Sequence, residues 1–261
     1  MREVLVIVKT YPEISKKHRE TVCTAGILKD TRKLIRLYPI RYRYLNGEQK
    51  FSKYQWIIAD IEKAATDDRP ESYTVTPDSL QLSHKIGTKD QWNERCRWIL
   101  NNDNMFDSVE VLKDHQKRFN TSLGIVKPKE ITNVKIEAKT EDELEGSIKK
   151  RDLVYQQLDL FEDNDNNLEI IPYRFFLEFI CDNKNCEGHK YSILDWEIAQ
   201  LYRKIANRKD WITQIKDKIQ GEIFSPKRET FLFLGNMARR HHIFCILGFF
   251  YPPKNRQLSL F

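Results

Sequence analysis

The stretch Val4-Leu-Val-Ile-Val8, followed directly by Lys9-Thr-Tyr-Pro12, decides the fold predicted for this chain. A short apolar run that ends at such a segment is typical of a buried strand. Further strands are predicted over residues 21–28, 33–44 and 54–61, the first two as a hairpin. We therefore expect the chain to begin with a sheet.

Helical and strand patterns follow each other farther along the chain. One helix is predicted to begin near Trp92 and another to cover 109–119, and strands are expected over 122–127 and 132–138. These patterns predict a β-rich domain over residues 1–138 that carries one or two helices.

The segment 139–168 is acidic and Asn-rich near its end, so we interpret it as a linker. Beyond it, apolar residues at helical spacing after Ser192 predict a helix, with strands before and after it. The predicted fold class is α+β, with a β-rich N-terminal domain, a smaller α+β domain over 169–252 and a tail over 253–261.

Composition narrows the class of protein. The 261 residues are 40% hydrophobic and 31% charged, which supplies enough apolar material for a core. The apolar run 243–251 is far shorter than the roughly 20 residues that span a bilayer. The first residues lack the pattern of a signal peptide, and five Cys at irregular spacing do not suggest a disulfide framework. We expect a soluble, cytoplasmic protein with no membrane partner.

Charge is distributed in blocks along the chain. Residues 1–60 hold 13 Lys/Arg against 6 Asp/Glu, residues 137–169 hold 4 against 11, and residues 170–261 hold 15 against 9. Two basic blocks separated by an acidic segment favour a polyanionic partner. Two solvated surfaces joined by a disordered linker are the alternative.

One pentapeptide occurs twice. Gln157-Leu-Asp-Leu-Phe161 and Gln257-Leu-Ser-Leu-Phe261 differ only at the middle residue. Such a peptide is expected by chance in on the order of one in a thousand chains of this size. Two Leu and one Phe supply compact apolar anchors, and Gln supplies an amide for the rim of a pocket.

Both copies resemble the short peptide by which bacterial polymerases, repair proteins and replication regulators dock on the DNA sliding clamp. The resemblance implies that the clamp is a partner and that the anchors are the Gln, the two Leu and the Phe of each copy: Gln257, Leu258, Leu260 and Phe261 in the tail, and Gln157, Leu158, Leu160 and Phe161 in the linker. Val154, Leu158 and Phe161 also have helical spacing, so the inner copy can instead be a packed helix.

Cations and aromatic residues alternate over the predicted strand 33–44. Basic grooves with stacking rings bind single-stranded nucleic acid on small β-barrels. The candidate nucleic-acid-binding residues are Arg36, Tyr38, Arg41, Tyr42, Arg43 and Tyr44. The alternative is an amphipathic strand with Tyr packed inward and Arg outward.

Three segments, Lys9-Thr-Tyr-Pro12, Thr21-Val-Cys-Thr-Ala-Gly26 and Arg36-Leu-Tyr-Pro39, carry a second resemblance. They are similar to uncharacterised bacterial proteins with a proposed dual OB-fold nucleic-acid-binding domain. This resemblance covers about the first 140 residues and implies an OB-like fold for the N-terminal domain.

Cysteine and histidine concentrate at Cys181, Cys186 and His189. Thiolates beside an imidazole at short spacing suit zinc, and Cys245, His241 or His242 are candidates for a fourth ligand. Reduced thiols in a loop and a catalytic metal are the alternatives.

Paired carboxylates are the candidates for catalysis. Asp60 and Glu62 would share one face of a strand, a geometry that suits magnesium, and Asp195 and Glu197 follow the Cys/His cluster. No Walker loop, Gly-x-Gly-x-x-Gly motif or Gly-x-Ser-x-Gly elbow occurs, which leaves the common nucleotide-binding and serine-hydrolase functions without a basis.

We therefore predict a nucleic-acid-binding protein that is recruited to the DNA sliding clamp and acts in DNA repair, replication control or defence against foreign DNA. The nucleic acid would be DNA, single-stranded or bound without sequence preference. A metal-dependent nuclease or other DNA-processing enzyme on the same tether is the alternative from another class. An interaction protein that blocks the clamp is the third. The sequence leaves open whether the chain is an enzyme.

Overall fold

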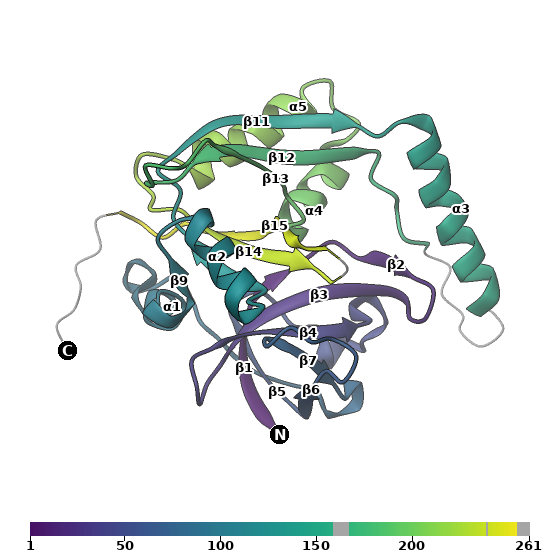
Figure 1. The fold of residues 1–261 in the computed structure, drawn as a ribbon. Helices are drawn as coiled ribbons and strands as arrows, with labels where there is room; N and C mark the ends of the chain where they lie inside the picture. The colour runs from purple at the N-terminus through teal and green to yellow at the C-terminus, as the bar shows by residue number, and fades with distance from the viewer. Residues whose placement is uncertain (159–166, 239, 255–261) are drawn as a thin grey trace.

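The N-terminal part of the chain forms one large antiparallel sheet with a single parallel pair, β4 with β7 (Figure 1). The structure is a computed structural model that describes residues 1–158, 167–238 and 240–254. The strands run in the order β6-β7-β4-β3-β1-β5-β8, and β2 pairs with β3. Their bounds are β1 Arg2–Lys9, β2 Glu13–Ser15, β3 Arg19–Leu28, β4 Leu34–Ile40, β5 Gln55–Ala59, β6 Ile61–Lys63, β7 Ser72–Val75 and β8 Gln81–Lys85.

Strand β1 lies inside this sheet and is buried on both of its faces. Leu5 and Ile7 belong to the core shared with the second sheet, whereas Val4 and Val6 belong to a separate core on the opposite face. A strand covered on both faces has no side for polar residues, which explains its continuous apolar run.

The C-terminal part adds two smaller sheets. One has the order β15-β14-β10-β9 and the other β11-β12-β13. Their strands are β9 Met105–Phe106, β10 Leu123–Val126, β11 Glu130–Ala138, β12 Tyr173–Ile180, β13 His189–Ser192, β14 Phe231–Met237 and β15 Arg240–Phe250.

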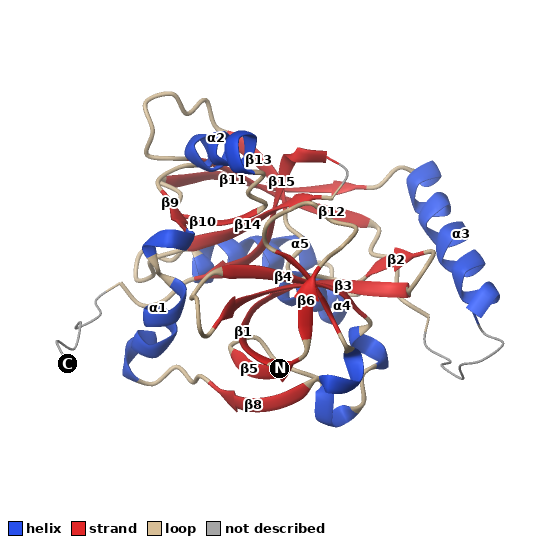
Figure 2. Cartoon of the chain, turned by 60° about the horizontal axis from the view of Figure 1, so that its bottom comes forward, coloured by secondary structure: helices blue, strands red, loops and turns tan. Residues whose placement is uncertain are grey.

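Five α-helices and several single turns connect the strands of the described chain (Figure 2). The helices are α1 Asn93–Ile99, α2 Val109–Phe119, α3 Glu141–Leu158, α4 Trp196–Ile205 and α5 Trp211–Lys216. The turns are η1 Tyr42–Tyr44, η2 Gly47–Gln49, η3 Pro77–Ser79, η4 Asp90–Trp92, η5 Asn102–Asn104 and the π-helical η6 Asp217–Ile223. Within the described residues, no helix is both long and apolar enough to cross a membrane.

The α+β prediction is confirmed. The chain is 30% helix and 39% strand, with a strongly curled β half-barrel in its N-terminal part and a smaller α+β C-terminal part. In Figure 1 the N-terminal sheet, the β14–β15 sheet and the β11–β12–β13 sheet follow one another from bottom to top.

The division between the sheets does not fall at residue 138. Strand β10 pairs with β14, and β11 pairs with β12, so both belong to the C-terminal sheets. Their partners lie more than thirty residues away along the chain. The prediction grouped β10 and β11 with the N-terminal strands because they follow those strands in the sequence, whereas their pairing partners belong to the C-terminal part.

The acidic segment predicted as a linker contains α3. The helix begins with a capping box in which the Glu143 carboxylate accepts from Thr140 N and the Thr140 hydroxyl accepts from Glu143 N. Near its end, Tyr155 Oη donates to Glu20 Oε2 at 2.7 Å and its ring lies 4.2 Å from the Arg19 guanidinium. These contacts hold α3 against the N-terminal sheet.

The predicted strand 33–44 is shorter than expected. Strand β4 ends at Ile40, after the cis peptide Tyr38–Pro39, and residues 42–44 form η1. Side chains alternate between the two faces of a sheet only within a strand, so this rule does not apply beyond Ile40. The Arg36, Tyr38, Tyr42 and Tyr44 side chains therefore do not share one face.

Two buried arginines join the N-terminal and C-terminal parts of the chain. We call the contact between these two parts the seam. Arg36 donates to Ser122 Oγ at 2.9 Å and to the Ser122 carbonyl at 3.2 Å, and Arg69 donates to the Asn236 carbonyl at 2.9 Å. Glu71 accepts from the Ser122 N–H and hydroxyl. Arg36 and Arg69 are 3% and 5% exposed, so these bonds replace water almost completely.

Replacing Arg36 with Met should lower the free energy of unfolding by about 3 kcal/mol, because it removes two buried charge-assisted hydrogen bonds to Ser122 that Met cannot replace. Urea unfolding followed by tryptophan fluorescence measures this change. The matched control is Arg2→Met, which removes an ion pair to the exposed Asp30 and should cost less than about 1 kcal/mol. Equal losses in the two variants would show that the seam does not depend on Arg36.

Candidate functional site

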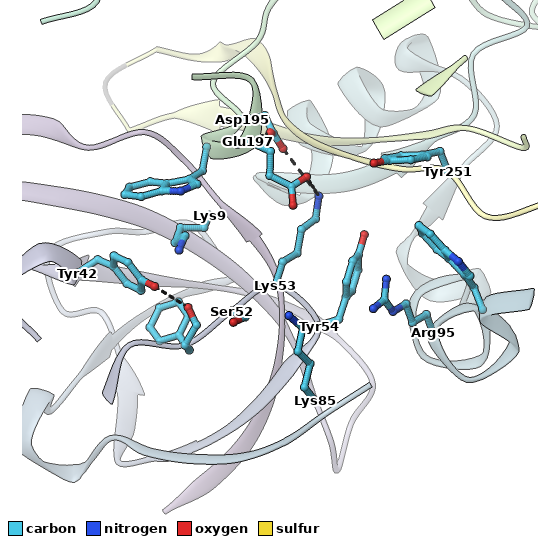
Figure 3. A pocket seen from close by; sticks show the side chains of 13 residues that line it. Lys9, Tyr42, Ser52, Lys53, Tyr54, Lys85, Arg95, Asp195, Glu197 and Tyr251 are labelled. Carbon is cyan, nitrogen blue, oxygen red and sulfur yellow. Dashed lines mark hydrogen bonds and ion pairs between the residues drawn. The ribbon is translucent and has the colours of Figure 1, made fainter. Parts of the chain in front are cut away.

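A pocket of about 340 Å³ opens where the N-terminal sheet meets the start of α4 (Figure 3). Its lining is unusual because cations and aromatic rings make up most of it. The lining residues are Lys9, Tyr42, Phe51, Ser52, Lys53, Tyr54, Lys85, Trp92, Arg95, Asp195, Trp196, Glu197 and Tyr251. We call this the seam pocket.

The seam pocket is built from turns and from the ends of strands and helices that lie far apart in the sequence. Lys9 is the last residue of β1, and the next residue, Thr10, forms a β-bridge with Asp195. Tyr11 N donates to the Leu194 carbonyl at 3.0 Å. The end of β1 is thereby fixed beside the start of α4.

Asp195 is the N-cap of α4. Its Oδ1 accepts from Glu197 N at 2.7 Å and from Ile198 N at 3.1 Å. The helix was expected directly after Ser192, but Ser192 still belongs to β13 and α4 begins at Trp196. Burial raises the pKa of Asp195 to about 6, although the neighbouring Lys53 opposes this shift.

Lys53 is an anchored cation. Its Nζ donates to the Phe249 carbonyl at 3.0 Å and lies 3.5 Å from Glu197 Oε2 and 3.8 Å from Asp195 Oδ2. Burial by itself would lower the pKa of Lys53, but the negative groups around it outweigh burial and the pKa is raised. Lys53 therefore carries a fixed positive charge.

Lys9 has a different environment. Its Nζ lies 3.7 Å from the centre of the Tyr42 ring and 4.4 Å from that of Trp196. Burial lowers the pKa of Lys9 to about 8, Glu197 opposes the shift and Lys85 adds to it. The ring faces favour the ammonium form of Lys9. Lys9 is thus held by cation–π contacts, whereas Lys53 is held by ion pairs.

The opposite wall is also cationic and aromatic. The Arg95 guanidinium lies 3.9 Å from the centre of the Tyr54 ring and donates to the Ile86 carbonyl at 2.7 Å. Trp92 and Tyr251 complete this wall, with ring centroids 5.6 Å apart. Half-buried rings beside cations can bind a planar, anionic ligand such as a nucleotide.

Only two of the four acidic candidates meet in this pocket. Asp195 and Glu197 line it, whereas Asp60 and Glu62 do not. Asp60 pairs with the N-terminal amine of Met1 at 2.9 Å, and Glu62 lies on the edge strand β6. The four carboxylates therefore do not form one magnesium site.

The predicted nucleic-acid strand is divided among different environments. Arg36 is buried at the seam, Arg43 pairs with the buried Glu20 at 2.9 Å, and Tyr38 is exposed. Of the six candidates, Tyr42 alone is among the residues of the seam pocket. The sequence did not identify Lys9, Lys53, Trp92, Arg95 and Tyr251 as site residues. Lys9 and Tyr251 stand at the ends of apolar runs, whereas the other three follow no local pattern.

A second site lies at the far end of β12. Ligand atoms of Glu110, Cys181, Cys186 and His189 lie within 4.8 Å of one another, so this cluster could hold a metal ion. His189 Nε2 is 2.9 Å from Glu110 Oε1 and 3.3 Å from Cys186 Sγ. Among the described residues Glu110, from α2, is the fourth member, in place of the predicted Cys245, His241 or His242.

The two pentapeptides lie outside the described side chains. Residues 159–166 and 255–261 are not described, and the side chains of Gln157 and Leu158 at the end of α3 are not described either. Their role as docking peptides stays a prediction.

Comparison with protein families divides the chain in two. A domain of unknown function (DUF8758) matches residues 1–101, and another domain of unknown function (DUF8757) matches residues 103–261. This division falls between β8 with α1 and the first strand of the second sheet, β9. No curated protein matches the chain.

Proposed function

The chain belongs to the DUF8757 family, and we propose that it is a nucleic-acid-binding protein that is recruited to the DNA sliding clamp. Its role would lie in DNA repair, replication control or defence against foreign DNA. The observation that carries the binding function is the seam pocket, in which ring faces and fixed cations surround a volume of about 340 Å³.

Size and chemistry of the seam pocket suit one unpaired nucleotide. Pockets of about 300 Å³ and more bind small ligands, and stacking on aromatic rings accepts any base. The exposed Lys85 supplies positive charge for a phosphate, whereas Lys53 is paired with Asp195 and Glu197. Because stacking and charge do not distinguish sequences, we propose binding of single-stranded DNA without sequence preference.

Lys85→Ala should weaken binding of a single-stranded oligonucleotide and lower the slope of log K against log salt by about 0.7, the loss of one phosphate contact. Trp196→Leu should weaken binding by about 1–3 kcal/mol through lost stacking and leave the salt slope unchanged. Fluorescence anisotropy over a salt series measures both. The matched control Lys117→Ala removes an exposed lysine of α2 that does not line the seam pocket, and it should change neither value. Variants that bind like the unchanged protein would contradict this site.

Recruitment to the clamp is supported by the repeated pentapeptide. Gln257–Phe261 follows Pro252-Pro253, and the inner copy begins at Gln157 and Leu158, the last two residues of α3. Two peptides on one chain can engage two equivalent pockets of a ring, which raises the apparent affinity through effective concentration.

Removing residues 257–261 should strongly reduce binding to purified sliding clamp in a surface-binding assay, because the apolar anchors are lost. Replacing Leu158 and Phe161 with Ala in the same protein should remove the remaining binding if the inner copy docks. A tail in which the same five residues are scrambled is the control for length and composition. Unchanged clamp affinity after the deletion would contradict the docking function of the tail.

We further propose that the Glu110–Cys181–Cys186–His189 cluster binds zinc in a structural role. Two Cys and one His are preferred zinc ligands, and tetrahedral bonds of about 2.0–2.3 Å place ligands roughly 3.5 Å apart. The second oxygen of Glu110, Oε2, is buried without a hydrogen-bond partner in the described chain, as a ligand atom that lacks its cation would be.

Protein purified without chelator should contain one zinc per chain by elemental analysis, and Cys186→Ser should lose most of it. Removal of zinc should also lower the midpoint of thermal unfolding, because the ion links α2 to β12 and β13. Cys23→Ser, a thiol outside the cluster, is the control. Equal zinc contents in the two variants would rule out this ligand set.

The geometry favours binding over metal-dependent cleavage. Asp195 is occupied by its cap hydrogen bonds and by Lys53, and Glu197 also faces Lys53. A divalent cation in the seam pocket would have to displace this lysine. Plasmid nicking that requires magnesium would favour the nuclease alternative, and clamp binding without any affinity for DNA would favour the clamp blocker.

A further inference from the structure

Two lysines of the seam pocket are held in opposite ways. Lys53 is fixed by a carbonyl and two carboxylates, whereas the amine of Lys9 forms no ion pair or hydrogen bond with a described residue and lies against two ring faces. Amines that are activated as nucleophiles are typically desolvated and close to another cation. Lys9 meets both conditions.

We propose that Lys9 is the nucleophile of a metal-independent lyase activity that cleaves DNA at abasic sites. The inference rests on the proposed function, since it requires that the seam pocket binds an unpaired DNA residue. An abasic site suits the pocket because its open sugar carries an aldehyde, the electrophile with which a lysine amine forms a Schiff base.

The position of Lys9 is rigid enough for this role. It ends the buried strand β1, and the bridge between Thr10 and Asp195 fixes the chain directly after it. Burial lowers the pKa of Lys9 to about 8, so a useful fraction of the amine is neutral near neutral pH. Lys53 stays protonated in the same pocket, where Asp195 and Glu197 hold it, and the exposed Lys85 is the cation that can bind the adjoining phosphate.

Each step of the reaction balances. The lone pair of Lys9 Nζ attacks C1′ of the aldehyde to give a carbinolamine. Its hydroxyl takes a proton from solvent and leaves as water, which gives a protonated imine, and the same proton returns to solvent when the imine is hydrolysed. The Glu197 carboxylate, which lines the pocket beside Lys53, removes a proton from C2′. The C3′–O bond then breaks and the phosphate leaves with the electron pair. Water hydrolyses the imine, which releases the unsaturated aldehyde and restores the amine.

Borohydride trapping tests this proposal. A single-stranded oligonucleotide with one abasic site is incubated with the full-length protein and sodium borohydride, which reduces the imine to a stable secondary amine. We expect a covalent protein–DNA complex whose cross-linked peptide, by mass spectrometry, contains Lys9. Without borohydride, strand cleavage should proceed in the presence of a chelator, and its rate should rise with pH and level off above about 8 as the amine becomes neutral.

Lys9→Arg keeps the positive charge but removes the nucleophile. It should lose both trapping and cleavage. Binding of the abasic oligonucleotide and of an intact oligonucleotide of the same sequence is measured with the unchanged protein. Lys117→Arg, the same change on the exposed face of α2, should trap like the unchanged protein.

The outcomes separate the two proposals. Trapping that persists in Lys9→Arg, a cross-link mapped to another amine, or binding of abasic DNA without trapping would overturn the lyase and leave the binding function standing. Absence of binding to both oligonucleotides would overturn the proposed nucleic-acid function and the lyase with it.

Discussion

The buried guanidinium groups of Arg36 and Arg69 are the constraint on which the arrangement of the two parts depends. They come from the N-terminal sheet and the loop before β7, and they donate to Ser122 and Asn236 of the C-terminal part. A buried arginine without acceptors is costly, so the two parts have one relative position in which these donors are satisfied. The shared apolar core of β1, β10 and β14 lies beside this polar seam and fixes the same position.

The seam pocket is a consequence of that position. Lys9 comes from β1, Lys85 from β8, Arg95 from α1 and Glu197 from α4. Only β8 and α1 lie close together in the sequence. The interiors of strands carry the apolar core, and polar residues stand at the ends of strands and helices. A place where several such ends meet therefore becomes a cavity lined by charged groups and rings. The chemistry of the site thus follows from the way in which the sheets are joined.

Within the pocket, the surroundings of each lysine decide its role. The carboxylates of Asp195 and Glu197 hold Lys53 as a cation, while burial and the nearby Lys85 lower the pKa of Lys9 to about 8, close to the point where its amine becomes neutral. Two identical side chains of one pocket can therefore have different roles, Lys53 as a paired structural cation and Lys9 as a nucleophile. The Glu110–Cys181–Cys186–His189 cluster lies at another place in the fold, and its chemistry is separate from that of the pocket.

The sequence by itself determined the elements whose pattern is local: the buried strand β1, the hairpin of β3 and β4, helix α2 and the α+β class. It also determined the repeated pentapeptide, since identity between two short segments needs no fold. Only the tertiary structure decided that β4 ends at Ile40, that β11 pairs with β12 across α3, that Arg36 is a structural residue, and that Glu110 completes the Cys/His cluster. The physical reason is that hydrophobic periodicity reports which face of an element is buried, whereas partners in sheets, seams and pockets are chosen by packing and hydrogen-bond satisfaction between segments far apart in the chain.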